Sequence, residues 1–150
     1  INTTVIGPYD KPKVKLPGAG GAPEIATSCS EILIVMAQSK RSFVDKLDFV
    51  TSLGHGKGGD DRKRQGVATK GPTKVITDLC IMEPDPETRE LTVTALHPGV
   101  TPEQVAAATG WSLKFAARLG ETAAPTEAEL TVLRDLHRRT NEAHQAKAAE

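Results

Sequence analysis

The stretch "EILIVMA", residues 31–37, is a continuous apolar run about as long as one β-strand. A half-exposed strand would alternate apolar and polar residues, whereas an unbroken apolar run is typical of a strand that is covered on both faces. Such strands occur mainly in parallel sheets, because the connecting helices then pack on both sides. The run therefore predicts an α/β fold with an open, mostly parallel sheet flanked by helices.

Immediately before this run, a glycine-rich loop joins a predicted strand to a predicted helix. Residues 14–16 have strand character, residues 17–22 read "PGAGGA", and the helix begins at Pro23 and ends near Cys29. Proline suits the first helical position because the N–H that it lacks would have no partner there. Glu24 complements the positive end of the helix dipole.

After the apolar run, the sequence predicts a hairpin and a further helix. Residues 73–82 and 90–96 have strand character on either side of the proline-rich turn "EPDPETR", so we expect them to pair. Thr101 and Gln104 match a capping box, with proline at the first helical position. That helix is expected to run through Ala108.

A second capping box opens the last predicted helix. Thr126 and Glu129 occupy the two capping positions, and leucines recur on one helical face at positions 130, 133 and 136. Residues 138–150 contain no apolar side chain larger than alanine. We therefore expect this helix to pack through one stripe and to end in a polar helical tail, residues 138–150.

Length and charge limit the class of protein. A chain of 150 residues is expected to form a single domain. Lysine plus arginine and aspartate plus glutamate balance at 19 each, so we expect no general attraction to nucleic acid or to an anionic membrane. The sequence shows no apolar run of membrane-spanning length, no signal-peptide pattern and no disulfide framework, which favours the cytoplasm.

Residues 54–66, "GHGKGGDDRKRQG", combine glycine with alternating charge and predict a mobile surface loop. Cationic and imidazole side chains of this loop have the chemistry to meet the phosphates of a ligand. Charged glycine loops are more often simply solvated, so the prediction leaves them outside the site: His55, Lys57, Arg62, Lys63 and Arg64.

The glycine loop has two interpretations. Gly18, Gly20 and Gly21 lack side chains, so several N–H groups can approach one negatively charged oxygen of a ligand. A tight turn that needs positive φ explains the same glycines. The loop is not a nucleotide-binding fingerprint, because "GAGGA" lacks the third glycine of G-x-G-x-x-G and no P-loop Lys-Ser or Lys-Thr pair follows. From these residues alone, both interpretations stay open.

Five segments occur in an order that resembles one enzyme family. They are "NTTVIG" (2–7), "KPKVKLPGAGGAPEIA" (11–26), "RSFVDKLDFVTS" (41–52), "VITDLCIM" (75–82) and "HPGVTPEQVAAATGW" (97–111). Together they resemble the β subunit of the family I CoA-transferases, and in particular the 3-oxoadipate and glutaconate CoA-transferases. The resemblance extends over residues 2–136, and five motifs in register are more specific than any one of them.

The resemblance implies a reaction and a site. In the family, a glutamate carboxylate attacks an acyl-CoA and passes through an anhydride to an enzyme-bound glutamyl-CoA thioester, before the CoA moves to a second acid. That glutamate precedes the "NTTVIG" motif, so we expect it upstream of Ile1. The first residues also have strand character with no turn or cap before them, which leads us to expect that the chain begins within a domain. The family's loop aligns with Gly18, Ala19, Gly20, Gly21 and Ala22, whose backbone is implied to line the thioester pocket and to stabilise the oxyanion.

The predicted function is the transfer of CoA from succinyl-CoA to 3-oxoadipate, by a cytoplasmic hetero-oligomer, α2β2 or similar, formed with a CoA-transferase α subunit. The substrates are an acyl-CoA and a dicarboxylic acid, with no metal and no further cofactor. This chain alone is expected to be inactive. Three alternatives stay open: a glutaconate CoA-transferase, a CoA-thioester or ring-opening hydrolase of the same fold, and a non-catalytic fragment or assembly module.

Other reactive side chains have structural explanations. Glu24 follows the loop, but a carboxylate in the first turn of a helix is common for reasons of dipole alone. His97 has no serine or cysteine nucleophile beside it in the sequence, and we expect it to pin its turn by a hydrogen bond. Cys29 and Cys80 have no neighbouring base and are expected to be core thiols.

Overall fold

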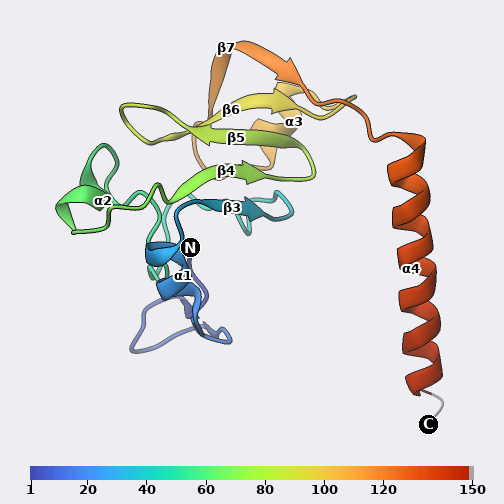
Figure 1. Cartoon of the computed structure of the whole chain (residues 1–150). Coiled ribbons are helices and arrows are strands. Elements are labelled where there is room, and N and C mark those ends of the chain that lie inside the picture. The colour runs from blue at the N-terminus through green and yellow to red at the C-terminus, as the bar shows by residue number, and fades with distance from the viewer. Residues whose placement is uncertain (149–150) are drawn as a thin grey trace.

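The computed structural model describes residues 1–148, and a five-stranded sheet is its largest element (Figure 1). The strands lie side by side in the order β3-β4-β5-β6-β7, which is also their order in the chain. Their bounds are Ile32–Val35, Pro72–Ile76, Cys80–Pro84, Leu91–Leu96 and Lys114–Glu121. The predicted α/β fold with an open sheet is confirmed, and the apolar run at residues 31–37 contains strand β3. The expectation that this strand is covered on both faces is wrong for residues 1–148, because β3 lies at the edge of the sheet and Leu33 and Val35 are 57% and 76% exposed.

The sheet is mixed, so the prediction of a mostly parallel sheet is wrong. β3 pairs with β4 in parallel, with Ile34 opposite Val75, and β6 pairs with β7 in the same sense. β5 is antiparallel to both of its neighbours. The connections before and after β5, residues 77–79 and 85–90, are too short for the crossover that a parallel pair needs.

Thr77 interrupts the segment that the sequence predicts as one strand, residues 73–82. Its hydroxyl oxygen accepts the N–H groups of Leu79 (3.0 Å) and Cys80 (2.9 Å), and this local turn reverses the chain. The segment therefore forms β4 and β5, and the predicted pairing with residues 90–96 is confirmed for β5 only. Strand β7 has no counterpart among the predicted elements.

A two-stranded ribbon, β1 (Val5–Ile6) with β2 (Val14–Lys15), leads into the glycine loop and helix α1 (Ala22–Ser28). These elements agree with the predicted strands and helix. The N–H of Gly18 donates to the carbonyl of Thr3 (2.8 Å), so the ribbon fixes the entry of the loop.

The core lies between the central strands and helix α3 (Pro102–Ala107). Four of its side chains are fully buried: Cys80, Met82, Val93 and Val105. Phe43 and Trp111 close one side of this core, with their ring centroids 6.1 Å apart. The predicted capping box of α3 is confirmed, because Thr101 and Gln104 exchange side-chain to main-chain hydrogen bonds of 2.8 and 3.4 Å.

Helix α4 (Glu127–Ala148) extends away from the sheet (Figure 1). Thr126 and Glu129 form the predicted capping box at its start. Leu130 of the predicted stripe is half-buried, whereas Leu133 and Leu136 remain 47% and 48% exposed, so most of the stripe is not packed within residues 1–148. The predicted polar tail, residues 138–150, is helical as far as Ala148, and its last two residues lie outside the described part of the chain. Within that part, no helix combines the length and the apolar character needed to cross a membrane.

Candidate functional site

The glycine loop, residues 18–22, needs glycine at two positions. Gly18 and Gly20 have φ angles of +98° and +50°, which side chains rarely tolerate. A Cβ atom added to either residue would meet no other atom within 4 Å. Gly21 has a φ of −82°, which any residue can adopt. The loop therefore presents bare main chain to an open space.

Two of the five N–H groups of this loop already have acceptors within the protein. The N–H of Gly18 is bound to Thr3, and that of Ala22 donates to the carbonyl of Ala19 (3.0 Å). Among residues 1–148, the N–H groups of Ala19, Gly20 and Gly21 have no acceptor. Three adjacent N–H groups thus remain for an anionic oxygen.

An apolar cavity of about 450 Å³ begins at the end of the loop. Ala22, Ile25 and Ala26 line it from the loop and α1, and side chains of the sheet line the opposite wall: Ile32, Ile34, Val75 and Leu91. Apolar walls of this kind suit the unbranched, weakly polar part of a ligand.

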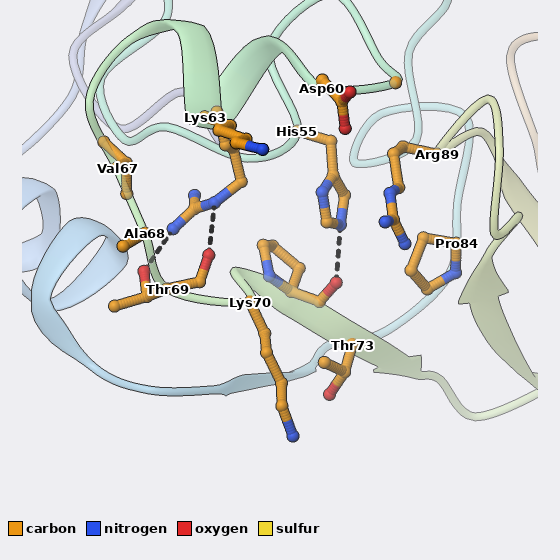
Figure 2. A pocket seen from close by; sticks show the side chains of 13 residues that line it. His55, Asp60, Lys63, Val67, Ala68, Thr69, Lys70, Thr73, Pro84 and Arg89 are labelled. Carbon is orange, nitrogen blue, oxygen red and sulfur yellow. Dashed lines mark hydrogen bonds between the residues drawn. The ribbon is translucent and has the colours of Figure 1, made fainter.

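A second cavity, of about 460 Å³, adjoins the first, and His55, Pro72 and Arg89 line both. Figure 2 shows its side chains. Its ionisable side chains are mostly basic: His55, Arg62, Lys63, Lys70 and Arg89, against the single carboxylate of Asp60. We call it the basic cavity.

Arg62 is buried, so the expectation that the charges of residues 54–66 are simply solvated is wrong for this side chain. It retains 6% of its exposure. Its guanidinium donates to three main-chain carbonyls, those of Gly54 (2.8 Å), Ala26 (3.2 Å) and Thr69 (3.2 Å), and to the Thr69 hydroxyl (2.6 Å). Burial lowers the pKa of this group, which nevertheless stays charged near neutral pH. Because all of its acceptors are neutral, its positive charge is not cancelled by them.

A short helix, α2 (Asp61–Arg64), forms within the segment predicted as a loop. The Asp61 carboxylate accepts the N–H of Lys57 (2.9 Å) and the side-chain amide of Gln65 (2.8 Å), which closes the turn before the helix. These hydrogen bonds lower the pKa of Asp61. Of the five side chains considered from sequence, three line the basic cavity, whereas Lys57 and Arg64 do not.

Arg89 and Lys70 also line the basic cavity, although neither was predicted as a site residue. Arg89 lies in the "EPDPETR" turn and has a φ of +65°, the only non-glycine residue with positive φ in the described chain. No sequence signal marks an arginine for the left-handed region.

His55 lies where the two cavities meet. Its Nε2–H donates to the carbonyl of Pro72 (2.7 Å), as Figure 2 shows. Burial lowers the pKa of His55, and the charges of Arg89 and Arg62 add to this effect, against the hydrogen bond to Pro72. The imidazole is therefore neutral near pH 7 in the absence of a ligand.

The remaining candidates behave mostly as structural residues. His97 bonds through Nε2 to the carbonyl of Thr77 and through Nδ1 to the hydroxyl of Thr122, both at 2.8 Å, which confirms its predicted pinning role. Glu24 is exposed in the first turn of α1. Cys80 is buried as predicted, but Cys29 is exposed because it follows the last residue of α1, so its assignment as a core thiol is wrong.

Comparison with known proteins assigns the family. The family model described as Coenzyme A transferase matches residues 1–108. The chain belongs to the coenzyme A transferase family. It is similar to the β subunit of 3-oxoadipate CoA-transferase from Pseudomonas knackmussii, with 62% identity over 150 residues. The match includes all of this chain and 58% of the Pseudomonas one.

Solved structures support the same fold for this CoA-transferase family member. Glutaconate CoA-transferase from Acidaminococcus fermentans superposes with a TM-score of 0.81 at 38% identity, over 89% of this chain and 51% of that one. IpdAB from Rhodococcus jostii superposes with a TM-score of 0.76 at 26% identity, over 89% and 53% of the two chains. The chain thus spans little more than half the length of the relatives that it matches.

Proposed function

We propose that this chain acts as part of the β subunit of a CoA-transferase that moves CoA from succinyl-CoA to 3-oxoadipate. The observation that carries the proposal is the 62% identity, over the whole chain, to the β subunit of a 3-oxoadipate CoA-transferase. Identity to the β subunit of the glutaconate enzyme is lower, at 38% over 136 residues, which is why glutaconate is the second choice of acceptor.

In this proposal the glycine loop stabilises negative charge on the thioester oxygen. Attack of a carboxylate on the thioester carbonyl forms a C–O bond and places charge on that oxygen, until the C–S bond breaks and CoA leaves as a thiolate. Preorganised N–H donors at such an oxygen are worth several kcal/mol. The unpaired N–H groups of Ala19, Gly20 and Gly21 support this role for residues 18–22.

The remaining parts of the reaction come from outside these residues. The nucleophile is a glutamate upstream of Ile1, as the family resemblance implies, and an α subunit completes the hetero-oligomer. The CoA thiolate attacks the glutamyl anhydride and releases succinate; 3-oxoadipate then attacks the glutamyl-CoA and takes the CoA by the reverse steps, so no oxidant or reductant is needed. We place the enzyme in the cytoplasm, which suits two unpaired thiols.

A chimeric enzyme tests the proposal. Residues 1–150 replace the matching part of the Pseudomonas knackmussii β subunit, and the product is assembled with the α subunit of that enzyme. We expect kcat/KM for 3-oxoadipate, with succinyl-CoA as donor, to exceed that for glutaconate, and to exceed that for acetate by about 100-fold or more, because a monocarboxylate leaves buried donors unpaired. Absorbance of the β-keto thioester provides the assay.

The same assay separates the alternatives. The unmodified 150-residue chain is the control and is expected to show no transfer, either by itself or with the α subunit. Turnover by that chain would overturn the external glutamate and would direct attention to Glu24, through a Glu24→Gln variant. Preference for glutaconate would move the acceptor to the second choice. Thioester hydrolysis without any acceptor would favour a hydrolase, as the 29% identity to the Rhodococcus jostii cholesterol ring-cleaving hydrolase IpdB suggests.

A further inference from the structure

The basic cavity has an excess of positive charge that the protein itself does not neutralise. Arg62, Lys63, Lys70 and Arg89 line it, and Asp60 is the one carboxylate among its lining residues. Within residues 1–148, Lys63 and Arg89 take part in no ion pair. Lys70 lies 3.8 Å from Glu31, but both side chains are exposed, so this pair is weak. A cavity with this balance attracts an anion.

Arg62 gives the cavity a rigid positive wall. Its four hydrogen bonds lock the guanidinium against α1 and the segment that precedes β4. Gly71 is part of this arrangement, because a Cβ atom there would lie 2.8 Å from Arg62 Cζ. A charge held in this way loses little conformational entropy when a ligand binds.

Arg89 occupies the cavity at the expense of backbone strain. Its φ of +65° is unfavourable for any side chain that lacks the local hydrogen bonding of asparagine or aspartate. Its N–H donates to the carbonyl of Asp85 (3.0 Å), which holds the turn in place. Strained residues of this kind concentrate at ligand sites, where the position of the side chain matters more than its conformational cost.

The loop and the two cavities adjoin one another in the order of a path with graded chemistry. Ala22 belongs both to the glycine loop and to the wall of the apolar cavity, and His55, Pro72 and Arg89 line both cavities. A ligand that follows this path has a reactive group at the loop, an apolar arm in the middle and an anionic head. Coenzyme A has this sequence of groups: thiol, pantetheine arm and phosphates.

On this basis we propose that the basic cavity binds the phosphate groups of coenzyme A, with Arg89 and Lys63 as direct partners and Arg62 as the fixed charge behind them. The assignment rests on the proposed function, which supplies coenzyme A as the ligand. The distal carboxylate of the dicarboxylic acid is a poorer occupant, because one arginine fork satisfies a carboxylate and this cavity offers four cations and an imidazole. His55 contributes a further N–H donor if the bound phosphate draws a proton to it.

Binding of CoA fragments to the 150-residue chain tests the site without any need for turnover. Isothermal titration calorimetry at low salt would compare CoA, dephospho-CoA, pantetheine, 3-oxoadipate and inorganic phosphate. We expect CoA to bind at least about tenfold more tightly than pantetheine, and the difference to shrink as salt is added. Inorganic phosphate should compete with CoA and leave pantetheine binding unchanged.

Three variants assign the effect to side chains. Arg89→Gly removes the guanidinium and also relieves the positive φ, so we expect CoA to bind about tenfold more weakly while pantetheine affinity and the thermal midpoint do not fall. Lys63→Gln should weaken CoA about threefold. Arg64→Gln is the matched control, because it removes the same charge one residue along, outside the cavity, and should leave CoA affinity unchanged.

The outcomes are separable from those of the transferase assay. Equal affinity for CoA and pantetheine, or no CoA binding by a folded chain, would overturn the phosphate site and leave the transferase proposal standing if the chimera turns over. Competition by 3-oxoadipate that depends on Arg89, without competition by inorganic phosphate, would assign the cavity to the dicarboxylate instead. If Arg64→Gln and Arg89→Gly weakened CoA binding equally, the loss of affinity would come from the change in net charge, and this result would also contradict the proposal.

Discussion

The glycine loop, residues 18–22, and the segment of residues 54–66 are both rich in glycine, yet they use it in opposite ways. In the loop, Gly18 and Gly20 adopt positive φ and face open space. In the second segment, Gly56 and Gly58 also adopt positive φ, but a Cβ atom would lie 2.0 Å from Asp61 Oδ2 and 2.4 Å from the carbonyl oxygen of Thr88. The loop keeps main chain accessible, whereas at Gly56 and Gly58 of the second segment protein atoms occupy the space that a side chain would need.

This difference separates the expected consequences of substitution. A side chain in the loop would occupy the space where a ligand oxygen approaches, so activity should fall and stability should change little. A side chain at Gly58 would displace protein atoms, so stability should fall. Gly66 provides a control for both regions, because its φ is +78° and no atom lies within 4 Å of its Cβ position.

The largest effect is expected for Gly20→Val in the chimeric enzyme. A branched side chain next to the free N–H groups blocks the approach of the thioester oxygen, so kcat should fall by about 100-fold or more. The positive φ should cost about 1–2 kcal/mol of stability in either variant, Gly20→Val or the control Gly66→Val. Steady-state kinetics and urea unfolding measure the two quantities. Comparable kcat values for the two variants would mean that the loop is only a turn and does not stabilise the oxyanion.

Gly21→Ala sharpens this result, because Gly21 has an ordinary φ and its nearest neighbour is Glu24 Oε2, at 4.0 Å from the Cβ position. A loss of kcat in this variant would come from the ligand side of the loop, without backbone strain. Wild-type activity would place the oxyanion nearer to Ala19 and Gly20.

A smaller effect, on stability alone, is expected for Gly58→Ala. The new methyl group would lie 2.4 Å from a main-chain oxygen, in a residue that already needs positive φ, and should destabilise the chain by about 2–4 kcal/mol. Gly66→Ala carries the φ penalty without the contact and should cost about 1 kcal/mol. Chemical unfolding of the 150-residue chain gives both values. Similar losses in the two variants would contradict the packing role of Gly58.

Local chemistry made much of the fold predictable. Pro23, the capping box of Thr101 and Gln104 and the apolar run at residues 31–37 are short-range signals, and each marks an element of the structure. The mixed sheet was not predicted because residues 73–82 have strand character and contain no glycine or proline to mark a turn. The turn at Thr77 depends on one hydroxyl group that competes with the strand for the backbone.

The site was predictable where it is made of main chain and obscure where it is made of side chains. Positive φ at Gly18 and Gly20 agrees with both interpretations of "GAGGA", and the family resemblance directs attention to that loop. The basic cavity joins Arg62, Lys70 and Arg89 from three separate segments. Composition alone makes residues 54–66 look solvated, because the acceptors that bury Arg62 are backbone carbonyls, which no residue pattern reveals.

The smallest effect is expected at low pH. Acid should loosen residues 54–66 but should not change the glycine loop, because that loop has no titratable side chain. The N–H of Lys57 and the side chains of Gln65 and Arg64 hold the pKa of Asp61 below its ordinary value of 3.8, the Lys57 N–H being the strongest cause. Because the folded-state pKa is lowered, this stabilisation is complete above about pH 4 and is lost as the pH falls through the lowered value.

The amide resonance of Lys57 reports this titration directly, since its N–H donates to Asp61 Oδ2 at 2.9 Å. Its chemical shift should change with a midpoint below 3.8, and the change should disappear in Asp61→Asn. Asp60→Asn is the matched control, because the Asp60 carboxylate accepts no hydrogen bond among residues 1–148, and the Lys57 titration should persist in it. A midpoint above 3.8 for the Lys57 amide, or loss of its titration in Asp60→Asn, would mean that Asp61 does not hold residues 54–66 in place. The contrast between this segment and the glycine loop would then depend on Arg62 and the glycine contacts alone.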